Sequence, residues 1–202
     1  MDSNNLSYIH PGAKIGKNVV IEPFCYIAEH VVIGDGCHIG PHATIYDFVR
    51  MGSDCLIMSY AHIAHDCRIG DHCIVVSHVG LAGETELDDW AIVGGGTMVH
   101  QFCRIGGYVM VQGGTRTSKD IPPFVIAGRE PVAFAGLNII GLRRRGFSRE
   151  TIDSIAHAYR LIYQCNLTVN EAIDAIKNEV PMSKEIEYII DFVSSSQRGI
   201  IR

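Results

Sequence analysis

The chain has 202 residues, a formal net charge of -5 at pH 7 and 47% hydrophobic residues, which suits one large domain or one domain with an appendage. No basic tract is long enough to indicate nucleic-acid binding, no apolar run approaches membrane-spanning length, and the first residues, MDSNNLSYIHPG, lack the features of a signal peptide. We therefore expect a soluble cytoplasmic protein with no nucleic-acid partner and no membrane span.

An apolar residue recurs at every sixth position from Ile9 to Val111, 18 times without a skip. A small or medium-sized residue stands four positions after each of them, and six of the seven cysteines fall there, where a buried free thiol acts as a small hydrophobe. Glycine often follows the apolar residue, which we attribute to a tight corner with unusual dihedral angles. Such hexapeptides predict an all-β left-handed parallel β-helix of about six coils, with three hexapeptides in each coil.

The repeat is expected to end within residues 117–136, where paired prolines indicate a boundary. The remainder is predicted to be helical. Ser148 can cap one helix, Thr168 with Glu171 forms a capping box before a second, and residues 183–196 have the apolar face of a third.

This organisation predicts two domains. We expect a β-helix domain over residues 1–128 and a C-terminal α-helical domain over residues 129–202. The helices would cover the end of the β-helix, because the last coil otherwise leaves strand edges unpaired.

The stretch AHIAHDC, residues 61–67, places two histidines three residues apart, with an aspartate directly after the second. By itself it fits a metal site, a general base with an orienting acid, or ordinary repeat residues. Because three hexapeptides make one coil, His65, Gly83 and Gln101 should stack along one edge of the prism.

Four stretches resemble one family. They are AHIAHDC, VHQFCRIGGYVMVQGG, IPPFVIAG and NIIGLRRRGFSRETI, which are similar to the UDP-N-acetylglucosamine O-acyltransferases of lipid A biosynthesis. The resemblance covers residues 54–202 nearly continuously. It implies a homotrimer that moves a 3-hydroxyacyl group from acyl carrier protein to the 3-hydroxyl of UDP-N-acetylglucosamine, with no metal and no organic cofactor.

This chain departs from the family in its N-terminal half. Family members carry extra coils there and a loop that contributes to the nucleotide-sugar site. Here the six-residue register runs straight through into AHIAHDC, so the fold should survive while UDP-N-acetylglucosamine binding is expected to be weaker.

The resemblance also implies roles for single residues. His65 would be the general base that takes the proton of the sugar hydroxyl, Asp66 would orient it, and the Gly83 N–H would stabilise the oxyanion. Gly113 matches the residue that limits acyl-chain length, and the lack of a side chain there predicts a preference for long chains. The implied substrate-binding residues are His62, Glu84 (a histidine in many members), His100, Gln101, Asn138, Arg144 and Arg145.

Several alternatives stay open. The chain could be a related hexapeptide acyltransferase with another acceptor, or a non-catalytic paralogue that binds acyl carrier protein. The histidines of AHIAHDC could also hold zinc at a subunit interface, as in trimeric β-helix carbonic anhydrases. The arginines near residue 144 could simply be a solvated face.

Overall fold

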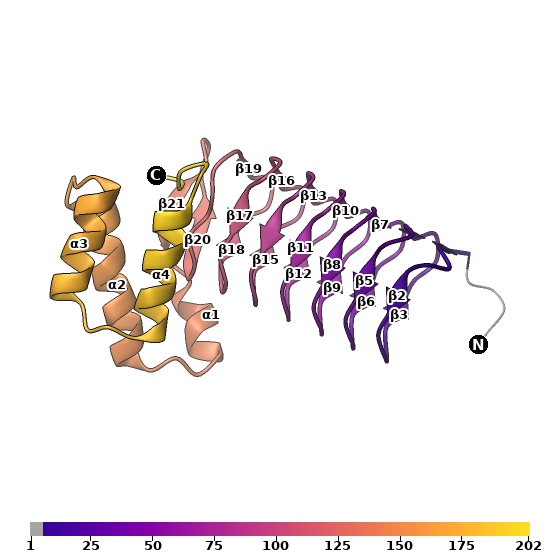
Figure 1. Cartoon of the computed structure of the whole chain (residues 1–202), viewed down its shortest axis with the longest axis horizontal. Coiled ribbons are helices and arrows are strands. Elements are labelled where there is room, and N and C mark those ends of the chain that lie inside the picture. The colour runs from indigo at the N-terminus through magenta and orange to yellow at the C-terminus, as the bar shows by residue number, and fades with distance from the viewer. Residues whose placement is uncertain (1–5) are drawn as a thin grey trace.

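The computed structural model describes residues 6–202 and consists of a row of coils that ends in a group of helices (Figure 1). Each coil contributes three strands of two residues each. In chain order these strands are β1 Tyr8–Ile9, β2 Lys14–Ile15, β3 Val20–Ile21, β4 Tyr26–Ile27, β5 Val32–Ile33, β6 His38–Ile39, β7 Thr44–Ile45, β8 Arg50–Met51, β9 Leu56–Ile57, β10 His62–Ile63, β11 Arg68–Ile69, β12 Ile74–Val75, β13 Gly80–Leu81, β14 Glu86–Leu87, β15 Ile92–Val93, β16 Met98–Val99, β17 Arg104–Ile105, β18 Met110–Val111 and β19 Arg116–Thr117.

Every third strand joins the same parallel sheet, so the coils form a three-sided prism. Sheet A has the order β1-β4-β7-β10-β13-β16-β19, and sheet B has β2-β5-β8-β11-β14-β17. Sheet C has β3-β6-β9-β12-β15-β18, followed by the later strands β20 (Val125–Gly128) and β21 (Ala133–Leu137). Partners in neighbouring strands are separated by three hexapeptides, as in the pairing of Ile63 with Leu81. The predicted parallel β-helix of hexapeptides is confirmed.

Three corners join the sheets. Corner A, between sheets C and A, includes His42 and Tyr60; corner B, between sheets A and B, includes Asp66; corner C, between sheets B and C, includes His72 and Trp90. The corner residue is in the left-handed region in almost every hexapeptide, and most of these residues are not glycine, for example Tyr60 at φ 61° and Asp66 at φ 60°. The turn therefore directs a full-sized side chain outward at each corner.

The apolar residue of every hexapeptide points inward. From Ile27 to Val111 all of them are buried, whereas those of the first coil, Ile9, Ile15 and Ile21, are half-buried because no described coil lies beyond them. The six repeat cysteines are buried free thiols, as predicted, and burial raises the pKa of the Cys67 thiol to about 11.

The glycines that follow the inward residue have a different cause from the one predicted. They do not have positive φ; those values fall two residues later. A Cβ on Gly34 would lie 2.6 Å from the carbonyl carbon of Gly52, and one on Gly94 would lie 2.5 Å from the Gly113 nitrogen. Close approach of successive coils therefore requires glycine, and the expectation of unusual dihedral angles was wrong.

The β-helix has one coil more than the six predicted, although this coil lies within the predicted domain of residues 1–128. Residues 112–128 form another coil, in which β19 pairs with β16, Ile121 bridges to Ile105, and β20 (Val125–Gly128) pairs with β18. Strand β21 (Ala133–Leu137) then pairs antiparallel with β20. This pairing crosses the predicted domain boundary between residues 128 and 129, so that division stays a prediction.

Four helices follow: α1 Ile139–Arg144, α2 Arg149–Gln164, α3 Val169–Glu179 and α4 Lys184–Ser195. The predicted cap Ser148 and the Thr168–Glu171 capping box are both present, whereas α1 was not predicted. None of the described helices is long and apolar enough to cross a membrane.

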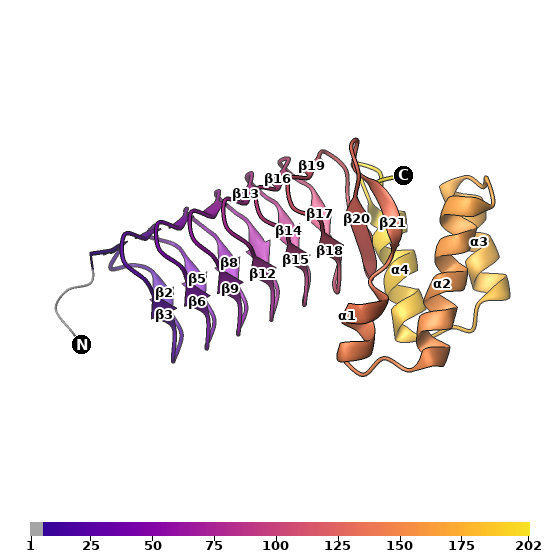
Figure 2. The ribbon, with the colours of Figure 1, turned by 180° about the vertical axis from the view of Figure 1, so that it is seen from behind.

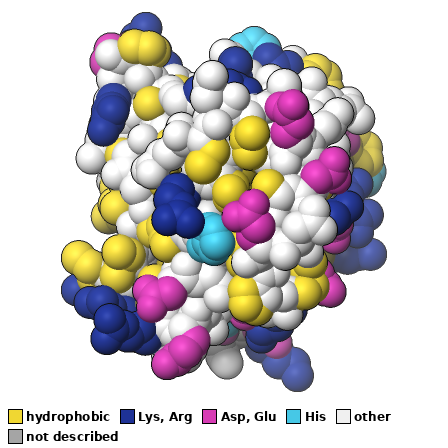
Figure 3. Space-filling view, turned by 90° about the vertical axis from the view of Figure 1, so that its left-hand side faces the viewer, with side chains coloured by type: hydrophobic (Ala, Val, Ile, Leu, Met, Phe, Trp, Pro, Cys, Tyr) yellow, Lys and Arg dark blue, Asp and Glu magenta, His cyan; other side chains and the backbone are white. Residues whose placement is uncertain are grey.

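The helices stand against the last coil, as predicted (Figure 2). The Tyr159 hydroxyl donates to the Pro123 carbonyl at 2.6 Å, and the Gly107 N–H donates to the Tyr188 hydroxyl at 2.7 Å. Seen from the helical end, charged side chains of both signs are interspersed with apolar ones (Figure 3). The helical region thus covers the core at this end and presents a mixed surface outward.

Candidate active site

His65 and Asp66 form a pair at corner B. The hydrogen bond between His65 Nδ1 and Asp66 Oδ2 is 2.9 Å long, and about half of each side chain is exposed. The left-handed turn at Asp66 directs its carboxylate outward beside the ring. Because the carboxylate accepts a hydrogen bond from the Nδ1–H group, the other ring nitrogen, Nε2, carries no proton and is left to accept one from a substrate.

Gly83 lies one coil beyond His65, buried beneath its ring. A Cβ at this position would lie 2.5 Å from both Cε1 and Nε2 of His65. No residue with a side chain fits here while the ring keeps this position, so Gly83 is required by close approach.

The Gly83 N–H has no hydrogen-bond acceptor within residues 6–202. At corner C several N–H groups of the same hexapeptide position are capped. The N–H of Lys17 donates to Asp35 Oδ1 and that of Ser53 to Asp71 Oδ1, both at 2.7 Å. A free backbone donor is thus left directly beside the histidine, where an oxyanion could accept it.

The other predicted residues of this edge surround the pair. His62 points outward from β10, and a hydrogen bond of 3.1 Å joins its Nδ1 to Thr44 Oγ1. His100 Nδ1 lies 3.1 Å from the Gln101 carbonyl oxygen. The Glu84 N–H donates to the His65 carbonyl at 2.9 Å, and the Glu84 side chain points outward at corner B. The structure therefore brings these residues together at one edge of sheet A.

Asn138 and the two arginines lie elsewhere on the chain. Asn138 caps α1 and donates to the Tyr108 carbonyl at 2.9 Å, at corner C. The Arg145 guanidinium lies 4.4 Å above the Trp90 ring, also at corner C, and Arg144 is exposed at the end of α1. One chain therefore does not unite these residues with His65.

Gly113 lies at corner A, exposed, with its nearest neighbours on Gly95. A Cβ added to Gly113 would lie 3.0 Å from the Gly95 carbonyl oxygen. It is therefore on a different corner from His65 as well.

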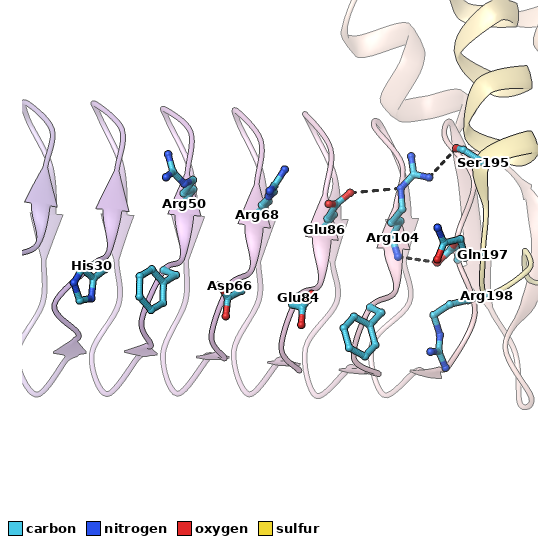
Figure 4. Close-up of a pocket in the computed structure, with 13 residues that line it drawn as sticks. His30, Arg50, Asp66, Arg68, Glu84, Glu86, Arg104, Ser195, Gln197 and Arg198 are labelled. Atoms are coloured by element: carbon cyan, nitrogen blue, oxygen red, sulfur yellow. Dashed lines mark hydrogen bonds and ion pairs between the residues drawn. The ribbon is translucent and has the colours of Figure 1, made fainter.

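A groove of about 770 Å³ runs along the sheet B side of corner B (Figure 4). Asp66 and Glu84 lie on one side of it, and Arg50 and Arg68 on the other. Neither arginine forms an ion pair with any residue in the described part of the chain. Sequence reasoning missed these cations, although both stand at the outward strand position of the repeat.

The side chains near this edge do not form a cluster of metal ligands. Between residues 6 and 202 there is no group of three or more His, Cys, Asp or Glu side chains placed to hold a metal ion. The second histidine of AHIAHDC and the aspartate after it meet instead as a hydrogen-bonded pair.

The hexapeptide β-helix places the chain among the bacterial transferases with hexapeptide repeats, whose sequence profile matches residues 7–47 and 48–83. The profile of UDP N-acetylglucosamine O-acyltransferase, domain 2, matches residues 120–201. The structure is similar to a UDP-N-acetylglucosamine acyltransferase from Bacteroides fragilis, with 45% identity, 100% coverage of both chains and a TM-score of 0.79. The chain belongs to the UDP-N-acetylglucosamine O-acyltransferase family.

Other relatives point to the same family. The Acinetobacter baumannii structure is 32% identical, with 98% of this chain and 99% of that chain covered and a TM-score of 0.78. The acyl-[acyl-carrier-protein]–UDP-N-acetylglucosamine O-acyltransferase of Halorhodospira halophila is 42% identical over 105 residues, which are 52% of this chain and 41% of the relative. The chain thus spans about two fifths of the curated relatives it matches.

Proposed function

We propose that this protein transfers a 3-hydroxyacyl group from acyl carrier protein to the 3-hydroxyl of UDP-N-acetylglucosamine, the first step of lipid A biosynthesis. The observation that carries the proposal is the His65–Asp66 pair, with the free N–H of Gly83 directly beneath its ring. The names of the relatives supply the donor and the acceptor.

His65 acts as the general base. Its Nε2 takes the proton of the sugar 3-hydroxyl while the oxygen attacks the thioester carbonyl, and Asp66 stabilises the imidazolium that forms. The carbonyl oxygen becomes negative and accepts a hydrogen bond from the Gly83 N–H. When the intermediate collapses, the carbon–sulfur bond breaks and the imidazolium returns the proton to the leaving thiolate. No cofactor takes part in these steps.

The functional unit is a homotrimer with corner A at its axis. Sheet C carries mainly apolar outward residues, such as Ile74 and Ile92, and the outward residues of sheet A include the aromatic Tyr8 and Tyr26. The outward residues of sheet B are mostly charged, as Arg68 illustrates. Sheet A of one subunit therefore packs on sheet C of the next, and sheet B faces solvent.

In this trimer, corner B of one subunit lies next to corner C of its neighbour. The His65 edge then faces the surface that carries Asn138, Arg144 and Arg145 of the next chain. Guanidinium groups suit the diphosphate of the nucleotide. The separation of these residues within one chain supports a site between subunits, and a cytoplasmic location follows from the need for acyl carrier protein as donor.

The decisive experiment incubates hydroxyacyl carrier protein with UDP-N-acetylglucosamine and identifies the product by mass spectrometry. We expect the 3-O-acyl sugar nucleotide, and a loss of about 100- to 10,000-fold in His65→Ala. Transfer only to another sugar nucleotide would favour the shifted-acceptor alternative. Donor binding without transfer would favour the non-catalytic paralogue, and activity that depends on stoichiometric zinc would favour the metal site.

A further inference from the structure

The outward residues of sheet A form a column that leads from the histidine edge toward the helices. His62, Gly80, Met98 and Arg116 are in register on β10, β13, β16 and β19. Gly80 has no side chain, so the column has a gap one coil after His62. The next coil brings Met98, an apolar side chain between a glycine and an arginine.

Met98 leans over the space that Gly80 leaves open. It is 51% exposed, and a Cβ on Gly80 would lie 2.7 Å from its Sδ. A shallow cavity of about 310 Å³ lies on the other side of Met98, toward Arg116, His100 and Ser118. Met98 therefore separates the open position above Gly80 from the cavity beyond.

The position of the oxyanion donor sets where an acyl chain starts. Gly83 is in the same coil as Gly80, so a thioester carbonyl that accepts the Gly83 N–H begins its chain at the level of Gly80. An acyl chain that runs from this point along sheet A toward the helices meets Met98 one coil later, about 4.8 Å further along the axis of the β-helix.

We propose that Met98 is a specificity-determining residue that limits the length of the acyl chain from the same subunit that supplies His65. This inference rests on the proposed function. Gly113 lies at corner A and can contribute only from elsewhere in the assembly, so the two positions act on the chain from different sides. Methionine suits this role because its long, unbranched side chain adapts to an apolar ligand.

The test is a competition between a short and a long 3-hydroxyacyl carrier protein. Met98→Ala opens the column, so kcat/KM for the long donor should rise relative to the short one by about fourfold for each methylene newly buried. Gly80→Ala, which pushes Met98 outward, should shift the ratio toward the short donor. Met182→Ala is the matched control, since Met182 is 48% exposed and lies outside sheet A, in the loop before α4.

Calorimetry with short and long hydroxyacyl pantetheines provides a second measurement. If the wild type transfers nothing to UDP-N-acetylglucosamine, the proposed function is overturned. The ratio of the calorimetric affinities for the long and short pantetheines still tests whether Met98 limits the acyl chain. A long-to-short ratio that is the same in wild type, Met98→Ala and Gly80→Ala would overturn the inference. A ratio that moves in opposite directions in the two variants and stays constant in Met182→Ala would support it.

Discussion

Gly83→Ala tests whether the contact between Gly83 and the His65 ring sets the activity. The added Cβ would lie 2.5 Å from His65 Nε2, whereas ordinary contact begins at 3.4 Å, so the ring must move by about 0.9 Å (3.4 minus 2.5). A displacement of about 1 Å at a catalytic group costs about 100-fold. We therefore expect kcat/KM to fall about 100-fold, which is about 2.7 kcal/mol of transition-state stabilisation.

The fold should tolerate this change, because the His65 side chain is half exposed and can turn toward solvent. Steady-state acyl transfer is measured in Gly83→Ala, in His65→Ala and in the double variant. The losses should not add, because without the ring the new methyl group displaces nothing. Activity of Gly83→Ala within a few-fold of wild type, or fully additive losses, would refute the reasoning.

Three further predictions concern other parts of the molecule. Gly113→Met should shift donor preference toward shorter acyl chains in the same competition assay, and an unchanged preference would remove Gly113 from this role. Calorimetry should show weaker UDP-N-acetylglucosamine binding than in a longer relative; equal affinities would mean that the missing loop is dispensable. Burial raises the pKa of Asp88, so its ionisation opposes folding. The stability that the protonated Asp88 side chain contributes is full below the unfolded pKa and is lost as pH rises through the folded pKa. Urea unfolding should therefore show Asp88→Asn gaining stability relative to wild type as pH rises from acid to neutral, and a difference that stays flat or reverses would contradict this.

The β-helix could be predicted from sequence because its signal is local and repeated. A period of six fixes which residue points inward, and a coil of three hexapeptides fixes which residues stack, so the alignment of His65 with Gly83 followed without coordinates. The capped helices could be predicted for a similar reason, since Ser148 and Thr168 satisfy backbone N–H groups within their own first turn.

The last coil was left out of the predicted count of six because its spacing changes. Val111 pairs with Ala127 and Ile105 bridges to Ile121, so each partner comes two positions earlier than three full hexapeptides would place it, and the paired prolines suggested that strands had ended. The sequence alone could show that Gly113 and His65 lie on different corners, because their separation is not a whole number of coils. The contact of Arg145 with Trp90 could not be predicted, because it depends on how α1 packs on the prism.

The proposed function depends most on a site that combines His65 of one subunit with Arg144 of its neighbour. His65→Ala removes the base, and Arg144→Glu repels the diphosphate from an exposed position, so each variant alone should be nearly inactive. When the two are co-expressed and assemble at random, about a quarter of the interfaces pair an intact His65 with an intact Arg144 from the other chain. Acyl transfer should therefore recover to about a quarter of wild type in the mixed trimers. Mixed trimers that stay as inactive as the separate variants would contradict a site shared between subunits.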